Sequence, residues 1–143
     1  MKVAVIVFFL GAFLGGVCTY YYPEIDTNVT PFDRNGDGAA DTQYIYRSDG
    51  SLKLLKMDRN YDGDIDDETE FDTSNLPVKE FSDDNFDGEF DTRTIYEFGI
   101  IKETLSDLDK DGEEDLRVFY NYGVMKKFEV LAEGEWKVVW IEK

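Results

Sequence analysis

The stretch DDNFDGEFD at residues 83–91, followed by TRTIYEFGIIKETL at residues 92–105, contains the pattern that decides the fold. Its first nine residues have three relatives in the chain, and all four copies fit D-x-[DN]-x-D-G-x-x-D. Successive copies start 25, 25 and 24 residues apart, so the pattern defines a structural repeat. The other copies are DRNGDGAAD at 33–41, DRNYDGDID at 58–66 and DLDKDGEED at 107–115.

The segments between these copies alternate in a way that predicts β-hairpins. Residues 42–57 contain two strand-like runs around a Ser-Asp-Gly turn, and the third and fourth units repeat this arrangement around the Phe-Gly turn at 98–99 and the Tyr-Gly turn at 122–123. The second unit is irregular, with Ser-Asn-Leu-Pro at 74–77 as its turn. The tail, residues 132–141, predicts a tight turn and one C-terminal capping strand. We therefore predict an all-β, antiparallel β-hairpin repeat array of about nine strands. Whether its sheet closes is left open.

The oxygen atoms of the repeated nonapeptide suit a hard cation. Calcium takes about six to eight oxygen ligands, and alternate residues of a tight loop can direct their oxygens to one point. The glycine at position six permits the sharp turn, and the aspartate at position nine takes the closing role that a glutamate at position twelve has in an EF-hand. We predict up to four Ca²⁺ sites, with side-chain ligands from positions one, three, five and nine and a main-chain carbonyl from position seven. The ligands are Asp33, Asn35, Asp37, Ala39 and Asp41; Asp58, Asn60, Asp62, Asp64 and Asp66; Asp83, Asn85, Asp87, Glu89 and Asp91; and Asp107, Asp109, Asp111, Glu113 and Asp115.

On these residues the chain resembles proteins with EF-hand-like D-x-[DN]-x-D-G-x-x-D calcium loops, such as the integrin-type FG-GAP and thrombospondin type 3 repeats. It is most similar to the DxNxDGxxD β-hairpin repeat proteins that bacteria export, and the resemblance covers residues 33 to about 131. The resemblance implies calcium binding and a location outside the cytoplasm. It implies little about a partner.

The composition excludes several kinds of function. The chain of 143 residues has 32 Asp and Glu, 15 Lys and Arg, no His and one Cys, with a formal net charge of −17. Without His it has no Ser-His or Cys-His pair and no imidazole zinc site, and one Cys cannot form an internal disulfide. We predict that the chain is not an enzyme and, because it repels phosphate backbones, that it binds no nucleic acid.

The negative charge lies with the repeated loops. Residues 33–115 contain 26 acidic and 9 basic residues, a net charge of −17, whereas residues 116–143 contain 4 acidic and 5 basic residues. The pattern predicts that at least three carboxylates converge in each loop, where their repulsion would oppose a compact state unless cations offset it. We therefore predict that calcium binding is coupled to folding.

The N-terminal segment predicts export. Residues 3–17, VAVIVFFLGAFLGGV, form an uncharged apolar run after Lys2. Its length suits a signal peptide, and the tyrosines at 20–22 extend it to nearly the length of a spanning helix. We predict a hydrophobic helix that is either a cleaved signal peptide or a membrane anchor. With Lys2 on the cytoplasmic side, the remainder is extracytoplasmic: periplasmic, at the cell surface or secreted.

These assignments divide the chain into three parts: residues 1–22 as signal peptide or membrane anchor, residues 23–32 as a linker, and residues 33–143 as a four-repeat calcium-binding β domain with a capping strand. Cys18 ends a Leu-Gly-Gly-Val-Cys sequence that resembles a bacterial lipoprotein box. A lipid on Cys18 is therefore a second way to reach the membrane.

The combined prediction is a calcium-binding module with a structural role or a protein or glycan partner. Two alternatives stay open. One is a carbohydrate-binding or carbohydrate-active module, which would use acidic pairs and stacking aromatic rings. The other is a metal-free β-meander in which the Asp-Gly loops are only turns. An aromatic residue recurs five residues after each copy, which favours a column in the sheet over a sugar platform. These aromatic residues are Tyr46, Phe71, Tyr96 and Tyr120.

Overall fold

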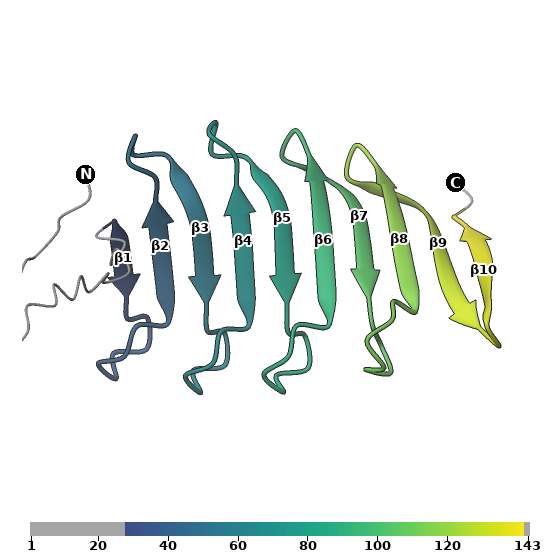
Figure 1. Ribbon diagram of the computed structural model, residues 1–143, viewed down its shortest axis with the longest axis horizontal. Coiled ribbons are helices and arrows are strands. Elements are labelled where there is room, and N and C mark those ends of the chain that lie inside the picture. The colour runs from purple at the N-terminus through teal and green to yellow at the C-terminus, as the bar shows by residue number, and fades with distance from the viewer. Residues whose placement is uncertain (1–27, 142–143) are drawn as a thin grey trace, which may run out of the picture.

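The computed structural model describes residues 28–141, which form ten β-strands and, within that range, no helix (Figure 1). The strands make one antiparallel sheet in which the order in space equals the order in the chain, so every neighbouring pair is consecutive in sequence. The strands are β1 (Val29–Phe32), β2 (Thr42–Tyr46), β3 (Leu52–Met57), β4 (Asp67–Phe71), β5 (Pro77–Ser82), β6 (Thr92–Glu97), β7 (Ile100–Ser106), β8 (Leu116–Asn121), β9 (Val124–Ala132) and β10 (Glu135–Trp140).

The all-β hairpin array predicted from the sequence is confirmed, and its sheet is open. The count is ten strands instead of about nine, because β1 lies within the segment 23–32 that we predict as a linker. This strand has only four residues, including Pro31, and therefore offers too few alternating positions to indicate a strand. It forms by pairing with β2, with Val29 opposite Ile45. The capping strand is present as β10.

The predicted N-terminal helix lies outside the described residues, and so do the signal peptide or anchor at 1–22 and Cys18. Within residues 28–141, no helix has the length and apolar character needed to cross a membrane.

Two kinds of connection alternate along the sheet. From β1 to β9, the repeated nonapeptides join the strands at one end, the lower edge in Figure 1, and short turns join them at the other end. The short turn between β9 and β10 lies at the lower edge. Each of β2, β4, β6 and β8 has a register shift just before the short turn that follows it, whereas β9 pairs with β10 without a shift. The recurring aromatic residues stand at these shifts and are all half-buried. They are Tyr46 in β2, Phe71 in β4, Tyr96 in β6 and Tyr120 in β8.

The sheet is a single layer with very little apolar core. Among the described residues, the only buried hydrophobic side chains are Leu105 and Val118. The other buried side chains are polar or acidic, and most lie where the strands meet the nonapeptide loops. Hydrophobic burial therefore supplies less stabilisation than in a two-layer domain, and the fold depends more on its hydrogen-bonded ladder and on the loops.

Candidate metal centres

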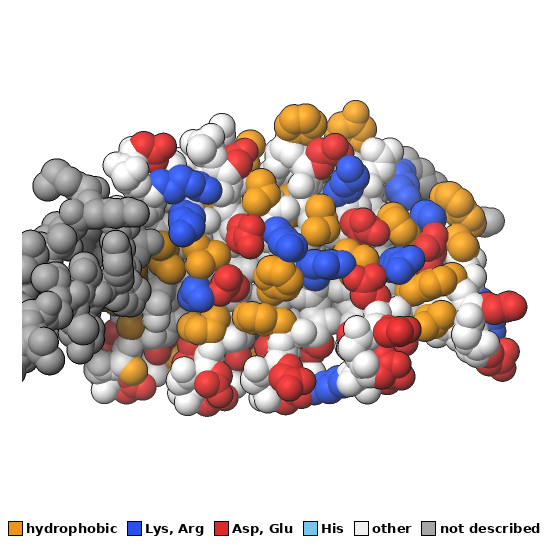
Figure 2. Space-filling view, in the orientation of Figure 1, with side chains coloured by type: hydrophobic (Ala, Val, Ile, Leu, Met, Phe, Trp, Pro, Cys, Tyr) orange, Lys and Arg blue, Asp and Glu red, His pale blue; other side chains and the backbone are white. Residues whose placement is uncertain are grey.

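The four nonapeptides lie side by side along one end of the sheet. We call them loops 1 to 4 (residues 33–41, 58–66, 83–91 and 107–115) and together the loop row. Neighbouring loops are two strands apart, which corresponds to about 9–10 Å. Figure 2 shows acidic side chains collected along this lower edge. The acidic residues that the sequence spaces 24 to 25 positions apart are thus brought into one row.

Main-chain hydrogen bonds tie each loop to the next. The carbonyl oxygen at position nine accepts from the N–H group at position one of the following loop: Asp41 from Asp58 and Asp66 from Asp83, both at 2.8 Å, and Asp91 from Asp107 at 2.9 Å. These bonds hold the loops at constant spacing. The residue that donates in each bond is also a predicted ligand of its own loop.

The aspartate at position one organises its own loop. In loop 3, one carboxylate oxygen of Asp83 accepts from the N–H of Phe86 and the other from the N–H of Gly88, both at 2.7 Å. Asp83 is 1% exposed. Loops 1, 2 and 4 repeat the same pair of bonds from Asp33, Asp58 and Asp107. Gly88 has φ +88°, a left-handed conformation that glycine adopts without strain.

The aspartate at position nine has a similar role that the sequence did not reveal. The Oδ2 atom of Asp66 accepts from the N–H groups of Arg59 and Asn60, and Asp41 and Asp115 repeat this arrangement in loops 1 and 4. Asp66 is 1% exposed. These carboxylates therefore stabilise the loop through the main chain, in addition to any ion that they bind. The signal for this role is the fixed distance of eight residues from the first aspartate of the loop.

Loops 1 and 4 each bring three carboxylates to one point. In loop 1 these belong to Asp33, Asp37 and Asp41, and one oxygen of each lies within 4.8 Å of the others. Two oxygens on opposite sides of a Ca²⁺ ion are also separated by about 4.6–5.2 Å, so this spacing fits the ion. The N–H of Ala39 and the side chain of Asn35 hold the pKa of Asp37 below its usual value, which keeps the carboxylate charged.

The corresponding group in loop 4 consists of Asp107, Asp109 and Asp115. Asp111 stays outside this group, and its carboxylate accepts from the N–H of Glu113 at 2.8 Å. The other position-seven residues, Ala39, Asp64 and Glu89, donate in the same way to the carboxylate at position five. Within residues 28–141, loops 2 and 3 contain no such group of three carboxylates.

Basic side chains from loops 2 and 4 contact loop 3. The ammonium group of Lys110, in loop 4, forms an ion pair with Asp87 and lies 3.2 Å from the Oδ1 atom of Asn85. From loop 2, the guanidinium group of Arg59 donates to the carbonyl of Asp83 at 2.6 Å and pairs with Asp67 at 3.0 Å. Lys110 therefore places a cation against two predicted ligands of loop 3. A basic residue inside an acidic loop is the signal that could have indicated this contact.

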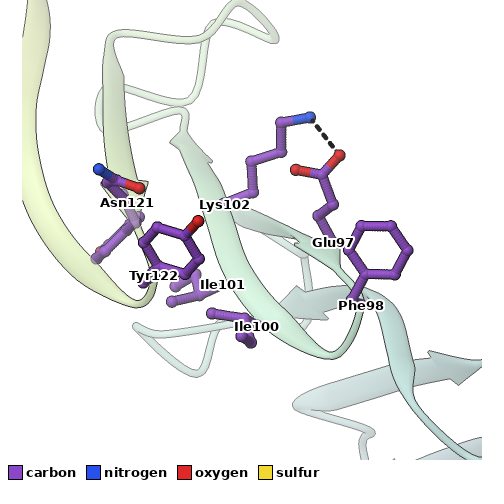
Figure 3. A pocket seen from close by; sticks show the side chains of 8 residues that line it. Glu97, Phe98, Ile100, Ile101, Lys102, Asn121 and Tyr122 are labelled. Carbon is purple, nitrogen blue, oxygen red and sulfur yellow. Dashed lines mark ion pairs between the residues drawn. The ribbon is translucent and has the colours of Figure 1, made fainter.

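The opposite end of the sheet exposes aromatic side chains. Phe98 and Tyr122 occupy the first position of their two-residue turns at φ 52° and 50°, and each is 86% exposed. A cavity of about 330 Å³ lies between these turns, and Figure 3 shows Tyr122 beside two isoleucines and the ion pair of Glu97 with Lys102. This surface offers aromatic faces and a few polar groups, far from the loop row.

Comparisons with known proteins assign no family. No protein-family model and no curated protein matches the chain. Among solved structures, the chain is similar to one described as the crystal structure of accessory secretory protein 1,2 and 3 in Streptococcus pneumoniae. The sequence identity is 16% and the TM-score 0.49, over 80% of this chain and 22% of that chain. The chain thus spans about a fifth of the length of that protein, and this likeness assigns it no function.

Proposed function

We propose that the chain is a non-enzymatic, calcium-binding repeat module that works outside the cytoplasm in a structural or partner-binding role. The observation that carries the proposal is the convergence of three carboxylates at 4.8 Å or less in loops 1 and 4. The ligand atoms that these groups offer are all oxygens, and hard cations prefer oxygen ligands. Calcium fits them better than magnesium, which demands near-ideal octahedral geometry and keeps several of its waters. The resemblance to exported calcium-loop repeats points the same way.

The single-layer sheet gives calcium a structural task. Its net charge of −17 is concentrated in residues 33–115, and the loop row gathers much of that charge at one end of the sheet. With only two buried hydrophobic side chains in the described part, the sheet has little hydrophobic stabilisation to offset the repulsion. Four bound Ca²⁺ ions would neutralise eight charges and reduce the net charge from −17 to −9.

Extracytoplasmic location is the second part of the proposal. It rests on the apolar run at residues 3–17 and on Lys2 before it. Calcium concentrations outside the cytoplasm suit loops of this type, because extracellular modules bind calcium with dissociation constants of about 10⁻⁴–10⁻³ M. The chain is either released by cleavage of this segment or tethered to the membrane, by the segment itself or by a lipid on Cys18.

Native mass spectrometry of the full chain in millimolar calcium tests the proposal directly. We expect species carrying up to four Ca²⁺ ions, with the first two assigned to loops 1 and 4 because these contain the complete carboxylate groups. The matched variants are Asp37→Asn and Asp109→Asn, each of which should remove one ion. A chain that carries no calcium at these concentrations contradicts the proposal and leaves a metal-free β-meander.

Replacing Lys110 by Met is expected to increase the calcium affinity of loop 3. The Lys110 ammonium group competes with the ion for Asp87 and Asn85. Because both partners are more than a third exposed, the ion pair contributes about 0.2–1 kcal/mol, which corresponds to a gain in affinity of about 1.4-fold to fivefold. Isothermal calorimetry measures the change. Lys102→Met, which alters a lysine at the end of the sheet opposite the loop row, is the control.

A double variant tests whether Lys110 acts through its ion pair with Asp87. In an Asp87→Asn background the ion pair is already weakened, so Lys110→Met should give a smaller gain there. An equal gain in both backgrounds would mean that Lys110 acts by its general charge, without competing for the ligands of loop 3.

A second candidate function is glycan binding at the end of the sheet opposite the loop row, where Phe98 and Tyr122 lie. The observation that favours it is the 86% exposure of both Phe98 and Tyr122, since large aromatic side chains at left-handed turn positions are unusual. Their rings, with Asn121 nearby in the cavity wall, could stack on a sugar ring and hydrogen-bond to it. A glycan array probed with the full chain, and repeated with Tyr122→Asn, distinguishes this candidate from the first.

A further inference from the structure

The two edges of the open sheet differ in what they present to another chain. On β10, the N–H of Ile141 donates to the carbonyl of Lys126. Because hydrogen-bonded and non-hydrogen-bonded pairs alternate in an antiparallel ladder, residues 139, 137 and 135 also point their main-chain groups toward β9. Trp136, Val138 and Trp140 therefore point their N–H and C=O groups away from β9, at the edge that no other strand of residues 28–141 covers, which we call the free edge.

The β1 edge is a poorer template for pairing. The N–H of Tyr46 donates to the carbonyl of Asn28, so the same alternation turns the main-chain groups of Val29 and Pro31 outward. Pro31 has no N–H group, and β1 has only four residues. Proline and short length are features that protect edge strands from pairing, and β10 has neither.

The outward-facing residues of β10 are arranged symmetrically about Val138, with a tryptophan two residues away on each side. Residues 136–140 read Trp-Lys-Val-Val-Trp, so an antiparallel second copy centred on Val138 places Val138 opposite Val138 and Trp136 opposite Trp140. Each of these pairs joins outward-facing residues and can exchange two N–H···O bonds. Val138 is 49% exposed and Trp140 68% exposed, and hydrophobic side chains gather at this end of the sheet in Figure 2. Aromatic and β-branched residues are favourable cross-strand partners.

The charge distribution favours the same arrangement. Residues 116–141 contain four basic and three acidic residues, so the β10 end is the part of a very acidic chain where two copies repel each other least. An antiparallel pair of edge strands is related by a two-fold axis normal to the sheet. That axis places the two loop rows at opposite ends of the joined sheet. A parallel pair, or a head-to-tail pair of β10 with β1, would bring the loop rows to the same end.

We propose that a second copy of this chain binds along β10, in an antiparallel register centred on Val138, to form a two-fold symmetric dimer with one continuous sheet of twenty strands. The contact combines the outward main-chain groups of three residues with two Trp136–Trp140 pairs. Nearby cations lie over these rings: the Arg117 guanidinium is 4.1 Å from the centre of the Trp136 ring, and the Lys127 ammonium is 5.6 Å from that of Trp140.

Disulfide cross-linking of the full chain tests the register. In a Cys18→Ser background, Val138→Cys places two thiols on opposed residues with about 5.5 Å between Cα atoms, within the range of about 4.4–6.8 Å that a disulfide spans. Val139→Cys is the matched control, because residue 139 faces Lys137 of the second copy in this register. We expect Val138→Cys to form a covalent dimer under mild oxidation at least tenfold faster than Val139→Cys.

Analytical ultracentrifugation gives an independent readout. Val138→Pro removes an outward N–H group but no bond to β9, so the circular dichroism spectrum should stay unchanged while the dimer dissociation constant rises at least tenfold. Equal cross-linking of the two cysteine variants, a monomer at all concentrations, or filaments of head-to-tail copies would each overturn the proposal. Because none of these measurements depends on calcium ligands, the outcome is separate from that of the calcium proposal.

Discussion

Removal of calcium with excess EDTA is expected to lower the melting temperature of the full chain by roughly 20 °C relative to 10 mM Ca²⁺. An ion at 100 times its dissociation constant stabilises a folded protein by about 2.7 kcal/mol, and 10 mM is about 100 times a dissociation constant of 10⁻⁴ M. Loops 1 and 4 alone would then contribute about 5 kcal/mol, which is comparable to the whole stability of many domains. Thermal scans by circular dichroism measure the shift.

Magnesium at the same ionic strength is the control for this experiment. Screening of the −17 charge would stabilise the sheet with either cation, whereas coordination by converging carboxylates should favour calcium. We expect magnesium to recover less than half of the shift. Equal melting temperatures in EDTA and in calcium would show that the loops are turns that hold no ion, and the calcium proposal would then fail.

Replacing Asp83 by Ala is expected to destabilise the chain by at least about 2 kcal/mol, even in EDTA. The substitution leaves the N–H groups of Phe86 and Gly88 without their acceptor, and each unpaired buried donor costs about 1–3 kcal/mol. Asp83 is 1% exposed, so water cannot readily replace the carboxylate. Urea unfolding in EDTA measures the change in the free energy of unfolding.

Asp49→Ala is the control for Asp83→Ala. The Asp49 carboxylate also accepts from a main-chain N–H, that of Ser51 at 2.9 Å, but it lies in an exposed turn at the other end of the sheet. Water can satisfy the Ser51 N–H, so the effect should be much smaller. If Asp83→Ala unfolds like the unmodified chain in EDTA and differs only in calcium, the carboxylate serves the ion alone. The structural role given to position one would then be wrong.

The parts of the fold that depend on a few adjacent residues could be predicted from the sequence, whereas the parts that depend on pairing between strands could not. The nonapeptides and the glycine-containing turns predict most connections between β2 and β9, because turn chemistry depends on a few adjacent residues. The strand β1 was not predicted, since its existence depends on pairing with β2. The aspartate at position nine was assigned to metal alone, whereas Asp66 accepts two main-chain N–H groups of its own loop.

The sequence by itself determined the four loops, the hairpins between them and the acidic character of the loops, because each is contained within about 25 consecutive residues. Only the tertiary structure decided how the repeats meet. It brought Lys110 against Asp87 and placed the main-chain groups of Val138 at a free edge. These features depend on strand register and on contacts between repeats, and a shift of one residue in the pairing of two strands would reverse the direction of every side chain.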